Sequence, residues 1–374
     1  MLLKFKIWLR FFFLLKNIRF KYLNCKPYDY VIFDEISLLW SSKFMPTNDF
    51  FVLESRYRIV YFNFLIIIKF FFHFFKSFSL TTSYFSAVLD YVSPHSVLTY
   101  IDNNPNFFKL SAYYNKARFV AVQNASRFEI RFEQKAHNIF LDHFFCFGQF
   151  EIDLYHSKEA RVNNYYPIGS LRNHLYRTSS FRPSRKAYDI CVVCEPSPGW
   201  DDIEGLGFED SLGSIAKFAL KYALSNGKTI CFAGKRSPNS MERIAELNWY
   251  QKYIGDEAKN IKENIKEHFS TYQLIDSSDV SIGFISTALL EGMSRGNRCL
   301  QCNYTGNVKW DFHYSGPWFT SEYTYEDFAK CVDYLFSLND SEFNALSKKC
   351  INYFIEDLPS DVAIKKVKEF VLNV

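Results

Sequence analysis

The segment DVSIGFISTALLEGMSRGNRCLQC, residues 279–302, holds residues suited to binding a phosphorylated ligand. An apolar strand leads into Ser286 and Thr287, which are typical first residues of a helix. Free amide groups and the helix dipole attract phosphate at such a position. Glu291 lies one turn further on the same side, where its carboxylate could accept hydrogen bonds from sugar hydroxyls. An ordinary capped helix with a solvated glutamate is the alternative.

A second candidate group is Gly234, Lys235 and Arg236, at the end of the predicted strand KTICFAGK. Glycine lets a ligand approach the backbone closely, and two cations suit a nucleotide phosphate. A solvated turn is the alternative.

Carboxylates at predicted strand ends in the first half are candidates for the catalytic group. Asp102 ends the strand SVLTYID and could act as a general base or as a nucleophile. Aspartate is also a common turn residue, which is the alternative interpretation. Asp34 and Glu54 end neighbouring strands and are weaker candidates.

Two further segments follow predicted strands and are expected to line the same site. They are residues 123–127 (QNASR) and residues 169–173 (GSLRN), and the second contains Gly169 and Ser170. Residues 196–202 (PSPGWDD) are a candidate for a mobile lid.

The sequence gives little support for a metal site or for several other functions. Nine cysteines include the pairs Cys191/Cys194 and Cys299/Cys302, but both pairs lie in or beside predicted strands, where residues three apart point to opposite faces. The histidines show no metal-binding spacing, and no phosphate-binding P-loop is present. The net charge of +4 does not indicate nucleic acid. The number of cysteines is odd and no secretory signal is visible, which argues against a framework of disulfide bonds. We therefore expect the protein in the reducing cytoplasm.

The elements that must position these residues alternate between strands and helices over most of the chain. With 374 residues the chain fits two domains. Residues 177–187 (RTSSFRPSRKA) lack apolar periodicity and are the predicted linker. We therefore predict an α/β protein with two Rossmann-like, doubly wound domains, at residues 28–176 and 188–374, which face each other across a cleft. Ligands bind such sheets at the carboxyl ends of the strands.

Two segments near the amino terminus raise the question of a membrane. Residues 1–27 combine bulky apolar residues with several lysines and arginines, which predicts a helix on a membrane surface, or otherwise a solvated helix. Residues 59–75 (IVYFNFLIIIKFFFHFF) predict a buried or membrane-apposed helix. Asn63, Lys69 and His73 interrupt this run, although a membrane span is an alternative.

Residues 268–302 resemble the donor-binding half of GT-B glycosyltransferases. They are similar to a family of bacterial surface-carbohydrate biosynthesis proteins with the rough pattern Y-E-L-I…S-D-V-V-I…S-T…E-A-L-A-R-G-K. Ser286, Thr287, Glu291, Arg295 and Gly296 match this pattern, whereas Leu-Glu-Gly replaces the more usual Tyr-Glu-Ala around the glutamate. Relatives include transferases that use CMP-activated ulosonic acids such as Kdo. The resemblance implies that Ser286 and Thr287 hold the donor phosphate and that Glu291 holds nucleotide or sugar hydroxyls. It also implies that the basic pair Lys235 and Arg236 offsets the charge of the leaving group, so that no metal ion is needed.

We therefore expect a metal-independent glycosyltransferase of GT-B architecture that needs no cofactor, because the nucleotide-sugar is its donor substrate. Its acceptor would be a growing surface glycan, as in capsule or lipopolysaccharide, or a lipid-linked glycan. We expect it on the inner face of the bacterial plasma membrane, without a nucleic-acid partner. A nucleotide-sugar epimerase of the same fold and a non-catalytic scaffold of a polysaccharide assembly complex are the alternatives.

Overall fold

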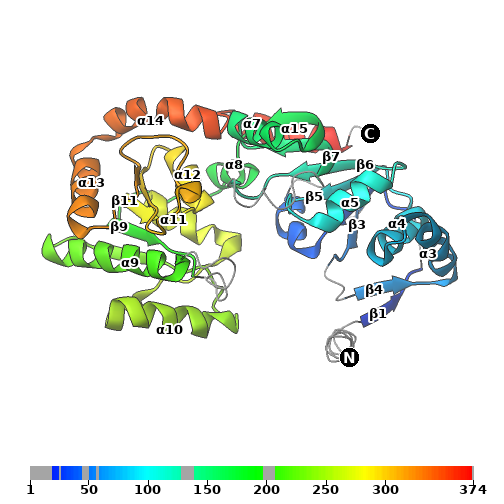
Figure 1. Ribbon diagram of the computed structural model, residues 1–374, viewed down its shortest axis with the longest axis horizontal. Coiled ribbons are helices and arrows are strands. Elements are labelled where there is room, and N and C mark those ends of the chain that lie inside the picture. Colours follow the sequence, from blue (N-terminus) through cyan, green and yellow to red (C-terminus); the bar gives the residue numbers. More distant parts are fainter. Residues whose placement is uncertain are drawn as a thin grey trace.

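The computed structural model of the chain describes residues 19–24, 27–43, 50–55, 59–127, 139–196 and 207–372. Figure 1 shows two α/β halves side by side, with the N-terminal half on the right, the C-terminal half on the left and helix α8 between them. Each half is built around its own parallel sheet. The prediction of two Rossmann-like domains is confirmed.

The first sheet has six parallel strands in the order β3-β2-β5-β6-β7-β8. Its inner strands are nearly continuous runs of buried apolar residues, as expected for a sheet covered on both faces. The strands are β2 (Tyr30–Phe33), β3 (Phe50–Leu53), β5 (Ser96–Thr99), β6 (Arg118–Val122), β7 (Phe140–Cys146) and β8 (Arg161–Pro167).

Short helices connect these strands. They are η1 (Glu35–Ser37), α2 (Leu38–Ser41), α3 (Phe64–Ser77), α4 (Leu80–Val92), α5 (Pro105–Tyr113), α7 (Gln149–Ser157) and α8 (Leu171–Arg177). Helix α5 begins where the sequence has a strong turn signal, because the Asn104 side chain accepts the N–H of Asn106 and Pro105 fits the first helical position.

The second sheet has five parallel strands in the order β10-β9-β11-β12-β13. The strands are β9 (Tyr188–Val193), β10 (Ile230–Ala233), β11 (Ser278–Gly283), β12 (Arg298–Cys302) and β13 (Phe319–Thr320). Its helices are α9 (Phe208–Ser225), α10 (Glu242–Ile254), η4 (Gly255–Asn260), η5 (Lys266–His268), α11 (Ser270–Asp276), α12 (Thr287–Met293), η6 (Val308–Trp310), α13 (Tyr325–Ser337) and α14 (Asp340–Phe354).

Both sheets reverse their strand order at one point. In the first sheet the reversal lies between β2 and β5, and in the second it lies between β9 and β11. A crevice forms at the carboxyl ends of the strands where the order reverses, and ligands of doubly wound sheets bind there. The fold thus directs attention to the residues that follow these four strands.

The last helix, α15 (Ser360–Leu372), packs on the first domain. Figure 1 shows α14 running across from the second domain and α15 lying beside α7 and β7. The ring of Phe370 lies 5.3 Å from that of Phe145 on β7 and 5.1 Å from that of Tyr166 on β8. The second sheet begins with β9 at Tyr188, just after the predicted linker, whereas α15 lies on the first domain although its residues belong to the predicted range of the second.

The amino-terminal region differs from the predicted pair of helices. Residues 1–18 lie outside the described part of the chain, but Arg19–Tyr22 form a strand, β1, which pairs in parallel with β4 (Ile59–Phe62). The predicted helix over residues 59–75 is therefore wrong in its first turn. Asn63 separates strand from helix, since its side chain accepts the N–H of Ile66 and caps α3.

Candidate functional site

A cleft of about 390 Å³ lies between the two sheets, at the points where their strand orders reverse. Small-molecule pockets in proteins occupy roughly 300–1,000 Å³, so the cleft is large enough for a ligand. The residues that follow the four strands in question line it: Ile36, Tyr100, Ile101, Glu195, Phe284 and Ile285. The expected interdomain cleft is present.

Three cations and five aromatic residues are among the side chains that line the cleft. Its cations are Arg172 from α8, Lys235 after β10 and Lys266 on η5, whereas Glu195 is its one carboxylate among the described residues. Its aromatic residues are Trp40, Tyr100, Phe269, Tyr272 and Phe284. This combination favours a ligand with negative charge and a flat ring system.

Arg172 sits among the aromatic side chains of the cleft. Its guanidinium carbon lies 5.4 Å from the ring centroid of Tyr272 and 5.9 Å from that of Trp40. Burial acts to lower the pKa of Arg172, but the neighbouring Tyr272 and Glu291 outweigh it and raise that pKa well above its usual range. The guanidinium is therefore a fixed positive charge at the cleft wall.

Of the predicted pair at the start of α12, Thr287 but not Ser286 is among the described residues that line the cleft. The Oγ1 of Thr287 accepts the backbone N–H of Ser126 at 3.1 Å. Ser286 is the N-cap residue, but its hydroxyl makes no capping hydrogen bond and lies buried. Ile285 precedes it with φ of 41°, a conformation that is unusual for a β-branched residue and typical of functional sites.

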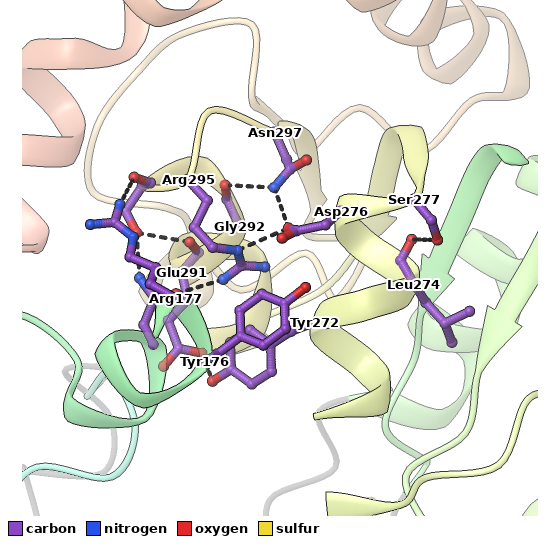
Figure 2. A network of polar contacts seen from close by, with 12 residues as sticks. Tyr176, Arg177, Tyr272, Leu274, Asp276, Ser277, Glu291, Gly292, Arg295 and Asn297 are labelled. Carbon is purple, nitrogen blue, oxygen red and sulfur yellow. Dashed lines mark hydrogen bonds and ion pairs between the residues drawn. The ribbon is translucent and has the colours of Figure 1, made fainter. Parts of the chain in front are cut away.

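Glu291 lies in a polar network that joins the two domains, part of which Figure 2 shows. The carboxylate is fully buried and accepts hydrogen bonds from the Ser170 hydroxyl, from the Tyr272 hydroxyl at 2.5 Å and from the Arg172 guanidinium at 3.4 Å. Sequence spacing predicts a carboxylate that faces a sugar. The structure instead surrounds it with protein donors, so a ligand hydroxyl would have to displace one of them.

The same network extends through Arg295. Its Nε donates to Asp276 at 2.9 Å, and its guanidinium lies 5.0 Å and 4.8 Å from the rings of Tyr176 and Tyr272. Figure 2 shows these two rings stacked next to Arg295. Because Tyr176 belongs to the first domain, Arg295 helps to fix the two domains relative to each other.

The carboxylates predicted for catalysis are engaged within the first domain. Asp102 is fully buried and pairs with Arg127, whose Nε donates to it at 3.0 Å, and it also accepts the N–H of Asn124. Asp34 is buried too, and it accepts the Ser55 hydroxyl at 2.8 Å and the N–H of Ile36. These contacts argue against either residue accepting a proton from a substrate.

Glu54 lies just after β3 and is partly buried. Burial is the largest cause of the raised pKa of Tyr61, and the charge of Glu54 is the second largest. It is not among the described residues that line the cleft. The cleft wall of the first domain therefore comes from residues other than the three predicted carboxylates.

The predicted basic pair after β10 separates in the structure. Lys235 lines the cleft and its ammonium lies 3.1 Å from Glu195, whereas Arg236 pairs with Glu242 on α10. Gly234 serves packing, because a Cβ there would lie 2.6 Å from the carbonyl oxygen of Lys262.

The GSLRN segment contributes to the cleft through Arg172, as the sequence predicts. Gly169 has φ of 76°, and a Cβ on it would lie 2.6 Å from the carbonyl oxygen of Glu356. Ser170 is the N-cap of α8 and accepts the N–H of Asn173. Both residues thus shape the turn that presents Arg172. From the QNASR segment, Asn124 and Ser126 line the cleft.

Several residues of the cleft escape sequence reasoning, among them Glu195, Tyr272 and Lys266. Glu195 follows β9 and carries the same strand-end signal as Asp34 and Asp102, so that signal could have identified it. Tyr272 and Lys266 lie on helical segments with no local pattern that distinguishes them. The lid predicted at residues 196–202 falls outside the described residues except for Pro196.

One buried carboxyl lies behind the cleft. Glu151 on α7 is fully buried, and its Oε1 accepts from the Gln123 side chain at 2.8 Å. Burial raises the pKa of Glu151 to about 8. At neutral pH it is therefore mostly a neutral acid within the first domain.

No group of three or more metal-ligating side chains is present among the described residues, and their eight cysteines are free. None of the helices in this part of the chain combines the length and the apolar character that a membrane crossing needs.

Comparison with known proteins supports the architecture. Residues 214–370 match the model of a family described as "putative O-antigen biosynthesis protein". This match covers most of the second domain and agrees with the resemblance to proteins of bacterial surface-carbohydrate biosynthesis. No match is found among curated proteins.

Solved structures resemble nearly the whole chain. A UDP-GlcNAc 2-epimerase of Methanocaldococcus jannaschii aligns with a TM-score of 0.56 and 11% identity, over 92% of this chain and all of the other. MnaA of S. aureus, in complex with UDP, aligns with a TM-score of 0.57 and 10% identity, over 92% of this chain and 98% of the other. At such identity these likenesses show the fold alone, which is GT-B.

A glycosyltransferase of Rickettsia africae also matches, with 10% identity over 93% of this chain and 99% of the other. Its TM-score of 0.45 is too low to bear on the function. The fold is thus established, whereas the function has to be argued from the chemistry of the cleft.

Proposed function

We propose that the chain transfers a sugar from a nucleotide-activated donor to an acceptor during the biosynthesis of a bacterial surface glycan. The observation that carries the proposal is the set of three cations and several aromatic rings that converge on the interdomain cleft. A diphosphate or a phosphate would meet Arg172, Lys235 and Lys266, and a nucleobase would stack on the aromatic wall. The match to an O-antigen biosynthesis family supports a surface glycan as the product.

The donor would lie mainly against the second domain, close to Thr287, Lys235 and Lys266. Positive charge there would stabilise the nucleotide as it leaves, so the reaction would need no metal ion. A CMP-ulosonic acid is one donor of this class that the sequence resemblance suggests. The acceptor, a glycan or a lipid-linked glycan, would approach from the first domain.

Glu195 is our candidate for the group that accepts the acceptor's proton. Its carboxylate lines the cleft, is nearly half exposed and lies 3.1 Å from the ammonium of Lys235. That ion pair positions the carboxylate beside the expected phosphate position. We place the reaction at the inner face of the plasma membrane, where lipid-linked acceptors are assembled.

A nucleotide-sugar epimerase is the second candidate, because a UDP-GlcNAc 2-epimerase is among the solved structures that share this fold. An epimerase would use the same cleft and the same cations but would need no acceptor. A scaffold would bind no nucleotide. The products distinguish the three functions.

The test is incubation of the full chain with labelled nucleotide-sugars, with and without a lipid-linked acceptor, followed by analysis of both sugar and nucleotide. We expect nucleotide release and transfer of label only when acceptor is present. Conversion of the donor to its epimer without acceptor would support the second candidate. Absence of both reactions with every donor tested would contradict both candidates.

A matched pair of variants ties the activity to the cleft. Lys266→Ala removes a cation of the cleft, whereas Lys259→Ala removes an equally exposed lysine of the neighbouring helix η4. We expect the first to lower turnover by about tenfold, the effect of one charge-assisted hydrogen bond, and the second to leave turnover unchanged.

A further inference from the structure

An unusual apolar surface lies at the end of the first domain that is remote from the second. Figure 1 shows helix α3 with strands β1 and β4 at this end of the molecule. We define the α3 face as the exposed large apolar side chains of α3, β1 and β4, together with those of Phe78 and Leu80, which follow α3 in the sequence. They are Phe20, Tyr22, Phe62, Phe64, Leu65, Ile67, Ile68, Phe71, Phe72, Phe75, Phe78 and Leu80.

The exposure of these side chains is substantial and follows helical spacing. Phe64, Phe75 and Phe78 are 75%, 69% and 79% exposed. Residues 64, 68, 71 and 75 recur every three or four positions, so they form one stripe along the outer side of α3. Monomeric soluble proteins rarely expose a continuous apolar surface of this kind unless it binds something.

The orientation of α3 is fixed from its inner side. Ile66 and His73 are buried, and His73 bonds to Asp90 of α4 at 3.0 Å and to Tyr113 of α5 at 3.1 Å. If α3 were rotated by half a turn about its axis, His73 would lose these two hydrogen bonds. The apolar stripe therefore belongs to the outside of the folded domain.

The charges around the α3 face have one sign. Arg19, Lys21 and Lys76 are exposed, and the Lys76 ammonium lies 4.0 Å from the ring centroid of Phe72. Residues 19–22 and 59–78 contain no aspartate or glutamate. In addition, residues 1–18, which lead directly into β1, contain four basic residues and no acidic one.

We propose that the α3 face docks onto the surface of an anionic phospholipid bilayer. Phenylalanine, isoleucine and leucine side chains would insert below the headgroups, and the flanking cations would contact the lipid phosphates. The absence of acidic residues is complementary to an anionic lipid surface. At 14 residues, α3 lies along the bilayer rather than across it. This proposal is independent of the reaction in the cleft.

The experiment is sedimentation of the full chain with phosphatidylcholine vesicles, with and without phosphatidylglycerol. We expect binding to the anionic vesicles and little binding to the neutral ones. Phe71→Ser combined with Phe75→Ser should weaken this binding by at least about tenfold, because two large apolar side chains can then no longer insert below the headgroups. Lys21→Glu combined with Lys76→Glu should weaken it as well, and it provides an independent variant if the first one folds poorly.

The matched control is Leu224→Ser combined with Ile244→Ser, which removes two exposed apolar residues from α9 and α10 of the second domain. It should bind vesicles as the wild type does. Failure of the wild type to bind anionic vesicles would overturn the proposal. So would unchanged binding of both face variants, which would assign the membrane contact to another segment. A dimer that the phenylalanine variant dissociates, without vesicle binding, would show that a second copy covers the face.

Discussion

The two domains place polar residues after their strands in the same way, but they use them differently. In the first domain, Asp34 and Asp102 are buried and bonded to side chains of their own domain. In the second domain, Glu195 and Lys235 follow β9 and β10 and line the cleft. A position after a strand therefore brings a residue close to the cleft, whereas its own hydrogen-bond partners decide whether it can meet a ligand.

A second contrast concerns the two glutamates of the second domain. Glu291 is fully buried with three protein donors from both domains, whereas the Glu195 side chain is 45% exposed. The first bonds to both domains, and the second is accessible from the cleft. The difference separates residues that build the cleft from residues that act in it.

The largest effect on stability is expected from Asp102→Asn. This change leaves the buried guanidinium of Arg127 without its charge partner, so we expect unfolding free energy to fall by about 3–5 kcal/mol in urea denaturation. Asp357→Asn is the control, because its carboxylate is mostly exposed in a pair with Arg177 and should cost less than about 1 kcal/mol. An Asp102→Asn protein of normal stability that has lost transfer would return Asp102 to the chemistry.

A smaller loss is expected from Glu291→Gln. The amide of glutamine keeps one acceptor oxygen, but it lacks the second acceptor oxygen and the negative charge that attracts Arg172. We therefore expect the free energy of unfolding to fall by about 1–3 kcal/mol in the same measurement. Glu242→Gln, on an exposed pair with Arg236, should change stability little. If Glu291→Gln instead abolished nucleotide binding at unchanged stability, the carboxylate would face the ligand.

The smallest effect at neutral pH is expected from Glu151→Gln, which mimics the protonated side chain. Burial raises the pKa of Glu151 to about 8 from an ordinary 4.5, so the folded state retains a proton that the unfolded state loses. Wild-type stability should therefore fall as pH rises from about 4.5 to about 8, and Glu151→Gln should lack this part of the decline. Melting temperatures of both proteins across that range test this, and parallel curves would contradict it.

Much of the architecture could be predicted from the sequence. Apolar runs such as YDYVIFDE and KTICFAGK correctly locate β2 and β10, and the Ser286–Thr287 turn correctly marks the start of α12. These features depend on local patterns of burial and capping. The pairing of β1 with β4 was not predicted. Each strand has only four residues and the two are far apart in the sequence, so no local sequence pattern indicates that they pair.

The roles within the site were harder to predict for a related reason. Helical spacing places Glu291 on the same side of α12 as Thr287, but its partners Ser170 and Arg172 lie 121 and 119 residues away in the sequence. Likewise, nothing near Asp102 indicates that Arg127 will neutralise it. Strand-end residues can be enumerated from the sequence, whereas their partners depend on how the domains pack.

The most direct test of the central claim, that the cations of the interdomain cleft bind a nucleotide, is calorimetric titration with UDP, GDP, CDP and CMP. Lys235→Ala and Lys252→Ala form the matched pair, since each lysine pairs with a glutamate but only Lys235 lines the cleft. We predict that the wild type binds at least one of these nucleotides, that Lys235→Ala weakens this binding by about tenfold and that Lys252→Ala leaves it unchanged. Equal affinity in all three proteins, or no binding of any nucleotide to the wild type, would contradict the account.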